Sequence, residues 1–455
     1  MEFLLPLLPL AFAALGLSLG FVQRHRRVRA WQDALRACGL QVTEPPGWSR
    51  QLTARAGPVA VKIETCGNKG RLTRITVWIP GPPDFHSLRI RREPLVRWGR
   101  EIEIGDKAFD EMFFIEGPPR LVLALLDAET RRLLIQANTV SRLEISNGTL
   151  RAENMADRMV PYVLPLLLNI AHRFVQPMDV LRRLTENATR DPEPGVRLQN
   201  LSLLIRELPD NPWTVEALRT ACSDKNLEVR LLAARNLGAE GRGVLLDLAE
   251  SLEDDAVSAK AVAALGRELP LERTRALLSN ALRRRCLQSA RTCLEALGQN
   301  GNAEDVDLLA KVMELEQGEL ATAAAQALGG TGRGLSARAE PPLILALQRE
   351  QPADLRAAAA QALGRIGSVA AVLPLKEAAE SSWLDLDLRR AARQAIAEIQ
   401  SRLSGASPGQ LSLASSEAGQ LSLAQDGDGR LSLAIDPAGQ LSLPPREPKQ
   451  PGQPV

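Results

Sequence analysis

Residues 354–364 read Asp-Leu-Arg-Ala-Ala-Ala-Ala-Gln-Ala-Leu-Gly. The apolar residues of this stretch recur at offsets 0, 3, 4, 7 and 8, which is the spacing of one face of an α-helix. Most of that face is alanine, and small side chains allow a neighbouring helix to approach closely. The stretch therefore predicts a helix that packs against copies of itself and ends at Gly364 as a C-terminal cap.

The same register recurs through residues 191–402. Aligned on the arginine of the quoted stretch, the copies lie at positions 197, 230, 258, 290, 321, 356 and 389, spaced 28 to 35 residues apart. A repeat of this length is typical of helical solenoids. A second apolar helical segment lies between successive copies, so we expect two helices in each repeat.

The pattern Asp-x-x-Val-Arg-x-x-Ala-Ala-x-Ala-Leu-Gly resembles the short HEAT repeats named after phycobilisome lyases. The resemblance implies an all-α solenoid over residues 191–403, with about seven repeats that serve as a binding scaffold. In that family an acidic residue at the turn caps the second helix, while an arginine braces the turn of an adjacent repeat. The residues at these positions are Arg197, Asp224 with Arg230, Asp354 with Arg356, and Asp387 with Arg389. Ser258, Ala290 and Ala321 replace the arginine in the middle copies, so we do not expect an unbroken ladder.

The N-terminus carries a different signal. Residues 3–22 are twenty residues without a charge, long enough to cross a bilayer as one helix, and Arg24, Arg26, Arg27 and Arg29 follow. For residues 1–29 we therefore predict a transmembrane anchor with a basic flank. The positive-inside rule then predicts a single-pass protein of the inner membrane, with its N-terminus outside and the bulk of the chain in the cytoplasm. The arginine excess of residues 23–100 fits either a solvated face or contact with anionic lipid.

Residues 30–153 alternate short β-branched runs with turn residues, which predicts an α+β module. We expect a hairpin at Asn147-Gly148, a dipeptide that favours a two-residue turn, and a helix over residues 127–137. The motifs Gly105-Asp106-x-x-Phe109 and Leu143-Glu144-x-x-Asn147-Gly148 resemble an uncharacterised bacterial domain found behind membrane anchors. That resemblance implies a place near a membrane and no chemistry.

Two segments remain outside the module and the repeats. Residues 154–190 predict connector helices, and the apolar stretch around residues 157–174 is either a buried helix that caps the first repeat or an interfacial membrane helix. Residues 404–455 form a low-complexity tail in which Gly-x-Leu-Ser-Leu recurs every ten residues. The tail is either a linker, disordered or weakly β-paired, or a ligand that adds edge strands to partners and gains avidity by repetition. The leucines of its motif are Leu411, Leu413, Leu421, Leu423, Leu431, Leu433, Leu441 and Leu443.

The composition limits the possible chemistry. The 455 residues are 45% hydrophobic and 3% aromatic with a net charge of +2, which suits a helical array and argues against a dedicated nucleic-acid binder. Five scattered cysteines predict neither a disulfide framework nor a metal site, and Cys293 matches a small buried position of the register. The three histidines all lie outside the repeats, and no phosphate-binding loop or nucleophile motif is present. We predict no cofactor, no metal and no catalytic residue.

These patterns favour a membrane-anchored cytoplasmic scaffold whose concave helical face, within residues 191–403, binds protein partners. Two alternatives remain open. One is a lyase or another enzyme of unknown substrate, which only the name of the repeat family suggests. The other is a structural role in the organisation of the cell envelope.

Overall fold

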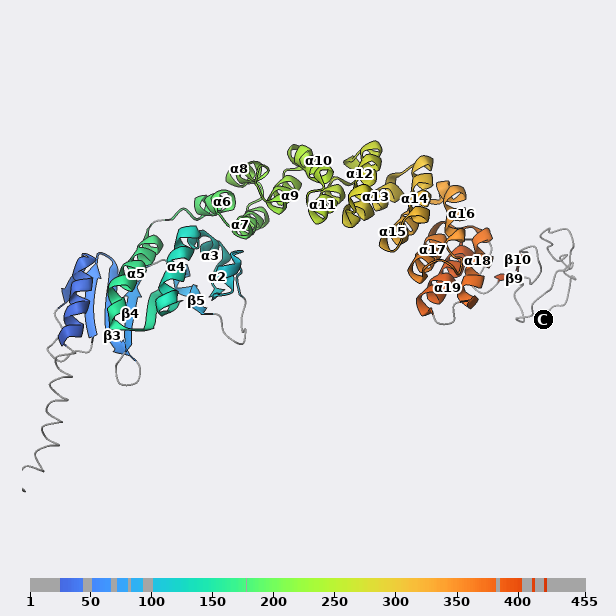
Figure 1. Ribbon diagram of the computed structural model, residues 1–455. Coiled ribbons are helices and arrows are strands. Elements are labelled where there is room, and N and C mark those ends of the chain that lie inside the picture. Colours follow the sequence, from blue (N-terminus) through green and yellow to red (C-terminus); the bar gives the residue numbers. More distant parts are fainter. Residues whose placement is uncertain are drawn as a thin grey trace, which may run out of the picture. The chain divides into compact units, whose positions relative to one another are not determined.

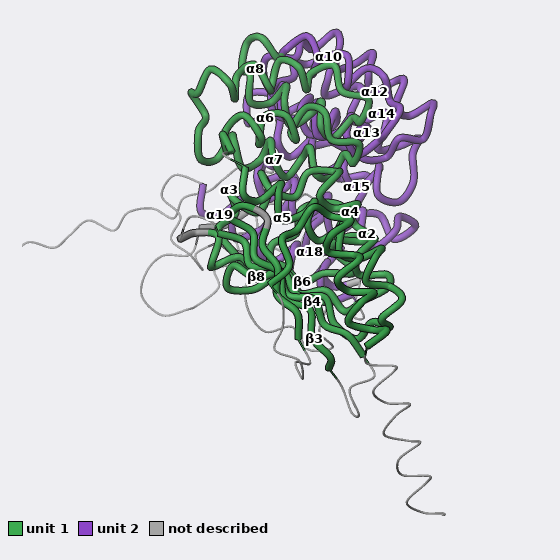
Figure 2. The backbone as a smooth tube through the Cα atoms, turned by 90° about the vertical axis from the view of Figure 1, so that its left-hand side faces the viewer, with its two compact units in different colours: residues 1–241 green, residues 242–455 purple. Residues whose placement is uncertain are grey.

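The computed structural model describes residues 25–43, 51–66, 72–80, 83–92, 101–176, 178–381, 385–402, 411–413 and 421–423. The chain folds as two compact units, residues 1–241 and residues 242–455 (Figures 1 and 2). The two units differ in the contacts that hold neighbouring helices together. The units are therefore described one at a time.

The first unit contains a single antiparallel sheet of eight strands in the order β1-β2-β3-β4-β8-β7-β5-β6. Its strands are β1 (Gln41–Thr43), β2 (Gln51–Ala56), β3 (Val59–Cys66), β4 (Leu72–Trp78), β5 (Arg89–Arg92), β6 (Phe113–Glu116), β7 (Arg142–Ser146) and β8 (Thr149–Met155). The pairing of β4 with β8 brings together segments that are far apart in sequence. The expected hairpin is present, because β7 and β8 pair across Asn147 and Gly148, which have φ values of 49° and 70°.

The strands follow the alternation of their sequences. Along β3, Val59, Val61 and Ile63 are buried while the residues between them are partly exposed, so one face of the sheet is covered by the core. Helices α4 and α5 lie on the sheet and contact strands β4, β7 and β8 (Figure 1). The apolar stretch around residues 157–174 thus forms α5, the cover of the sheet.

The helical part of the first unit begins inside the α+β module and continues into the first repeats. Residues 25–37 are helical, and the α-helices that follow are α2 (Lys107–Asp110), α3 (Pro119–Leu125), α4 (Ala128–Val140), α5 (Val160–Val175), α6 (Val180–Arg190), α7 (Pro194–Glu207), α8 (Pro212–Ala221) and α9 (Leu227–Asn236). One continuous hydrophobic cluster runs from Trp31 through the sheet to Ala233. The expected boundaries at residues 153 and 190 therefore both fall inside one compact unit.

The second unit is built from helix pairs. Its helices are α10 (Arg242–Ser251), α11 (Asp255–Leu265), α12 (Leu271–Arg284), α13 (Leu287–Asn300), α14 (Ala303–Leu315), α15 (Glu319–Leu328), α16 (Ser336–Leu345), α17 (Ala353–Ile366), α18 (Val372–Ser381) and α19 (Leu386–Ser401). The copies of the alanine-rich register form the odd-numbered helices α11 to α19, and each of these contacts the next. The predicted architecture, an α+β module followed by helical repeats, is confirmed at this level.

Glycines that follow the Leu of the register let these helices touch backbone to backbone. A Cβ atom added to Gly298 would lie 2.9 Å from the Cα of Ala327, and one added to Gly329 would lie 2.7 Å from the Cα of Ala362. One on Gly364 would lie 3.0 Å from the Cα of Ala395. We call these contacts, Gly298–Ala327, Gly329–Ala362 and Gly364–Ala395, the glycine–alanine seam.

The expected cap at Gly364 is wrong. Helix α17 continues through this residue to Ile366, and Gly367 takes the C-cap position with a φ of −63°. Gly364 is glycine because α19 packs against it, and no turn requires it there. Gly266, at the same register position of an earlier copy, does cap α11 with a φ of 49°.

Cys293 lies in the core of the second unit, as expected for its register position. Its side chain is fully buried in α13. Burial raises the pKa of the Cys293 thiol to about 12, because the thiolate loses its hydration there. The thiol is therefore protonated at neutral pH and acts as a small apolar side chain.

The predicted inner-membrane location is corrected. Among the described residues no helix combines the length and the apolar character needed to cross a bilayer. The longest α-helices of the described residues, α5 and α19, have 16 residues each. At about 1.5 Å per residue they reach about 24 Å, less than the hydrocarbon core of about 30 Å. Residues 3–22 and Arg24, on which the expectation rested, lie outside the described residues.

Candidate interaction groove at the module joint

A buried ion-pair network joins the α+β module to the first repeat. Arg131 of α4 donates from both terminal nitrogens to the carboxylate of Asp191, with N–O distances of 2.9 Å. Its Nε atom donates to Asp106 at 2.8 Å, and Nη1 also donates to the Leu126 carbonyl at 2.9 Å. The side chains of Arg131 and Asp191 are 3% and 1% exposed. Burial alone would lower the pKa of Arg131. The hydrogen bonds to Asp191 and Asp106 outweigh burial and raise this pKa above its usual value, so the guanidinium stays charged.

The next repeat uses the same arrangement. Arg197 of α7 donates to both carboxylate oxygens of Asp224 at 2.7 Å, and to the main-chain carbonyl of Asp191 at 2.7 Å. Asp224 in turn accepts from the backbone N–H of Asn226, the residue that caps α9. The partner of Asp224 is therefore the arginine of the preceding copy. We call the contacts Arg131–Asp191 and Arg197–Asp224 the arginine–aspartate ladder.

The ladder ends at Arg230. In the described structure the Nε atom of Arg230 is buried without a hydrogen-bond partner. Asp191 and Asp224 stand six residues before Arg197 and Arg230, and Asp224 stands two residues before the helix cap. In the next copy the cap is Asp254, and the position two residues earlier holds Leu252. The sequence therefore provides no aspartate to continue the ladder.

The other predicted turn residues have different partners. Arg356 is 8% exposed and donates from Nε to the Leu347 carbonyl at 3.1 Å. Asp354 lies in the first turn of α17, and Asp387 lies 3.4 Å from Arg390 in the first turn of α19. The backbone N–H of Arg389 donates to the carbonyl of Asp385, the cap of α19.

The predicted residues of the termini are placed only in part. Arg26, Arg27 and Arg29 lie on the helix of residues 25–37, where Arg27 pairs with Asp157 at 2.5 Å. In the tail, Leu411, Leu413, Leu421 and Leu423 belong to the strands β9 (Leu411–Leu413) and β10 (Leu421–Leu423). Leu431, Leu433, Leu441 and Leu443 lie outside the described residues.

Two glycines bring the walls of the joint into direct contact. A Cβ atom on Gly105 would overlap the backbone of Gly195, and one on Gly195 would overlap the backbone of Gly105. Gly105 precedes Asp106 of the ion-pair network, and Gly195 lies in the first turn of α7. The module and the first repeat are thus held at one spacing by a close backbone contact and by a buried charge network.

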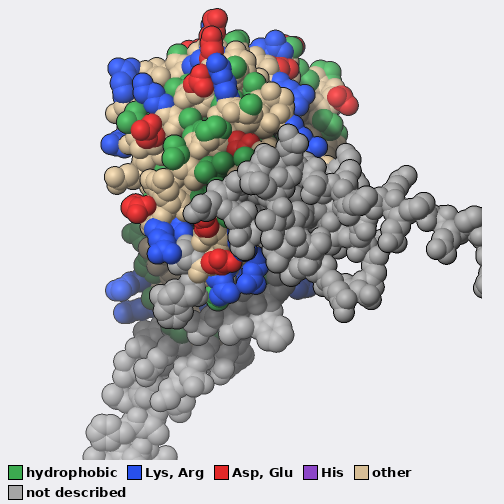
Figure 3. All heavy atoms as spheres, turned by 90° about the vertical axis from the view of Figure 1, so that its right-hand side faces the viewer, with side chains coloured by type: hydrophobic (Ala, Val, Ile, Leu, Met, Phe, Trp, Pro, Cys, Tyr) green, Lys and Arg blue, Asp and Glu red, His purple; other side chains and the backbone are tan. Residues whose placement is uncertain are grey.

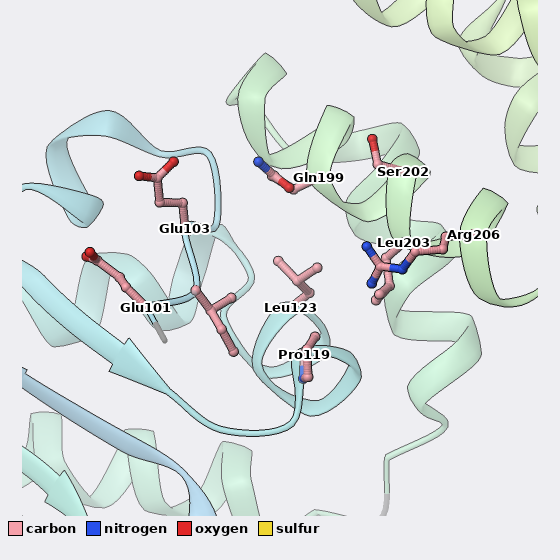
Figure 4. Close-up of a pocket in the computed structure, with 9 residues that line it drawn as sticks. Glu101, Glu103, Pro119, Leu123, Gln199, Ser202, Leu203 and Arg206 are labelled. Atoms are coloured by element: carbon pink, nitrogen blue, oxygen red, sulfur yellow. The ribbon is translucent and has the colours of Figure 1, made fainter. Parts of the chain in front are cut away.

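Beside this contact lies an open groove of about 340 Å³, which we call the joint groove (Figure 4). One wall is the extended segment of residues 101–103, held to the sheet because the N–H of Ile102 donates to the Ile115 carbonyl at 2.9 Å. The opposite wall is one face of α7, and α3 contributes between them. The lining residues are Glu101, Ile102, Glu103, Pro119, Leu123, Gln199, Ser202, Leu203 and Arg206.

The two walls differ in charge. Glu101 and Glu103 lie on one wall, while Gln199, Ser202 and Arg206 lie on the other, with Leu123 between them (Figure 4). Leu123 and Leu203 are almost fully buried and form an apolar floor.

Charged contacts support the far end of the α7 wall. Glu207 accepts hydrogen bonds from Arg120 of the module and from Arg206, the latter at 3.1 Å. The hydrogen bond from Arg120 is the main reason why the pKa of Glu207 lies below its usual value. Arg120 and Glu207 thus add a second, more exposed link between α3 and α7.

A second open groove lies in the other unit, between α16 and α18. It has a volume of about 570 Å³, and Leu345 is 59% exposed on its wall. Its lining residues are Ile344, Leu345, Leu347, Gln348, Arg349, Pro374, Glu377, Ala378 and Glu380.

On the face of the molecule drawn in Figure 3, basic and acidic side chains are interspersed, in keeping with the near-neutral charge of the chain.

The chemistry offered by the joint groove is that of binding. It presents carboxylates, an amide, a hydroxyl and a guanidinium around an apolar floor. Within the part of the chain that the structure describes, no group of three or more His, Cys, Asp or Glu residues has the geometry to hold a metal ion.

The sequence patterns did not single out this groove. Glu101, Pro119 and Gln199 belong to three different segments of the chain, and no motif links them. One usable signal was present: Gln199, Ser202 and Arg206 follow a helical spacing on a face of α7 that the apolar pattern leaves polar.

The comparisons with known proteins assign no family to the chain. No protein-family model matches the chain, and no curated protein matches it. Among solved structures, human deoxyhypusine hydroxylase in complex with glycerol is similar, with 18% sequence identity and a TM-score of 0.21. The similarity covers 49% of this chain and 96% of that one. At that score it supports no inference about what this chain binds.

Proposed function

We propose that the chain is a HEAT-like helical-repeat scaffold that binds a protein partner, and that the joint groove recognises a short segment of that partner. The observation that carries this proposal is a groove with walls of opposite chemistry, fixed by a buried ion-pair network. A binding site is most precise when its supporting elements are rigid. Here Arg131, Asp191 and the Gly105–Gly195 contact provide that rigidity.

The dimensions of the groove suit an extended peptide. From Gln199 to Arg206 the α7 wall rises about 10 Å, the length of about three residues of extended chain. A peptide lying here would place an apolar side chain on Leu123 and Leu203. It would direct a basic side chain towards Glu101 and Glu103, and a carbonyl or carboxylate group towards Arg206.

The proposal is tested by photo-crosslinking in cells. A photoreactive residue at Ser202, on the groove, should capture a defined partner protein. The same residue at Glu216, which is exposed on α8 away from the groove, should not capture it. Equal capture from both positions, or no discrete product from Ser202, would refute the proposal.

The captured partner then allows a direct measurement of affinity. Glu103→Arg reverses one charge on the groove wall, and we expect about tenfold weaker binding, which corresponds to about 1.4 kcal/mol. Glu216→Arg is the matched charge reversal outside the groove and should leave the dissociation constant unchanged. Equal effects of the two substitutions would place the binding surface elsewhere.

A further inference from the structure

The tail contains a pair of strands with the same sequence. β9 and β10 are both Leu-Ser-Leu, and they form a two-stranded antiparallel sheet. Leu411 pairs with Leu423, Ser412 with Ser422, and Leu413 with Leu421. Each strand therefore faces a partner of its own sequence, in a register that is unchanged when the two strands are exchanged.

This symmetry has a consequence for association between chains. A strand that pairs with an identical strand of its own chain can pair in the same way with that strand in another copy, because backbone and side chains are the same. We propose that the Leu-Ser-Leu tail is a self-association element, whose strands pair with those of a second copy of this chain.

The available edges support this choice of partner. In the part of the tail that the structure describes, β9 and β10 pair only with each other, and a further strand could add at the second edge of each. A sheet of two strands is marginal in water, and three or more are needed for independent stability. Proteins commonly protect open edges with lysine, proline or a bulge, and the Leu-Ser-Leu triplet contains none of these.

Repetition strengthens the argument. The triplet occurs four times at ten-residue intervals, at residues 411–413, 421–423, 431–433 and 441–443. Once β9 or β10 of one chain has paired with a strand of another, the neighbouring triplets are held close together, and a further contact forms at a high effective concentration. Weak single contacts can therefore add up to a stable dimer or larger assembly.

Sedimentation velocity of the full chain over a range of concentrations tests the proposal. The wild-type protein should shift from monomer to larger species as concentration rises. A variant with Ser412→Pro, Ser422→Pro, Ser432→Pro and Ser442→Pro should associate at least about tenfold more weakly, because proline removes an N–H group and disrupts strand pairing. The matched control changes the same four serines to alanine, keeps every N–H group, and should associate like the wild type.

Each result decides the question. The proposal is overturned if the wild-type chain stays monomeric at every concentration, or if the proline variant associates as strongly as the wild type. It is also overturned if the alanine control loses association to the same extent as the proline variant. Far-UV circular dichroism should show the same helical signal in all three proteins, because the four serines follow α19, the last helix of the described residues, in sequence. Neither groove is altered in these variants, so the outcome is independent of partner binding at the joint groove.

Discussion

The two units join neighbouring repeats by different means. In the first unit, charged side chains bridge consecutive elements through the ladder of Arg131 with Asp191 and Arg197 with Asp224. In the second, backbones touch across the seam of Gly298 with Ala327 and Gly329 with Ala362. The same sequence register therefore supports two kinds of interface. Where the next copy supplies an aspartate, the arginine pairs with it, and at the seam small residues let the helices touch.

Among the substitutions considered, loss of Arg131 should have the largest effect on stability. Arg131→Met leaves Asp191 buried without its cation, and we expect the first unit to lose about 3–5 kcal/mol of unfolding free energy. Hydrogen exchange measured by mass spectrometry during urea unfolding would report each unit separately. Arg132→Met is the matched control, because Arg132 is 53% exposed and pairs with Glu129 on its own helix, so no measurable loss of stability is expected. Similar losses in the two variants would contradict a structural role for the ladder.

At the glycine–alanine seam we expect a glycine-to-alanine substitution to destabilise the protein, although helix propensity alone would predict stabilisation. Gly298→Ala should stabilise an isolated helix by about 1 kcal/mol, but its Cβ atom would overlap the backbone of Ala327. We expect the second unit to lose about 1–3 kcal/mol, again measured by hydrogen exchange in urea. Gly243→Ala in α10 has open space around its Cβ and should be neutral or slightly stabilising. A gain in stability from Gly298→Ala would show that the seam is looser than described.

A smaller effect is expected where an aspartate of one copy caps a helix of the next. Asp255 accepts the backbone N–H groups of Gln288 and Ser289 at 2.8 Å, and the cap residue of α13, Cys286, forms no side-chain cap of its own. Asp255→Ala should therefore cost about 1 kcal/mol and speed amide exchange in the first turn of α13. Glu253→Ala changes an exposed neighbour and should leave that exchange unaltered. If the amides in the first turn of α13 exchanged equally slowly in the two variants, Asp255 would not contribute to capping this helix.

The exposed link of the joint should show the smallest effect, and it should depend on pH. Because Arg120 lowers the pKa of Glu207 below 4.5 in the folded chain, this contribution is present at neutral pH and is lost as pH falls through the folded pKa. Glu207→Gln should reduce stability by less than about 1 kcal/mol at neutral pH, since Arg120 is half exposed. Urea unfolding at several pH values should show the difference between variant and wild type closing below pH 4.5. A difference that stays constant with pH would assign the effect to packing.

Much of the fold could be predicted because its signals are local. The alanine-rich register is a helical period, and all of its copies from residue 197 to residue 389 are helices. The Asn147-Gly148 turn depends on neighbours in sequence, and it is present. Strand β6 was not expected, because Phe-Phe-Ile-Glu is too short to show a period, and only pairing with β5 makes it a strand.

The features that could not be predicted depend on partners far away in sequence. Arg131 and Asp191 are sixty residues apart, and nothing near either residue indicates that they meet. In the copies that have it, the glycine after the Leu of the register looks the same in sequence, yet Gly266 caps a helix while Gly364 packs against one. The joint groove is defined by three such distant segments, so its residues could be found only after folding.

The position of Asp191 affects how this protein can be divided for experiments. A fragment that starts at residue 191, where the repeats begin in the sequence, would contain Asp191 but lack Arg131, its ion-pair partner. It would also leave the first turn of α7 without the glycine that packs against it. The first repeats should therefore be produced together with residues 101–190, whereas a cut near residue 241 would fall at the boundary between the two compact units.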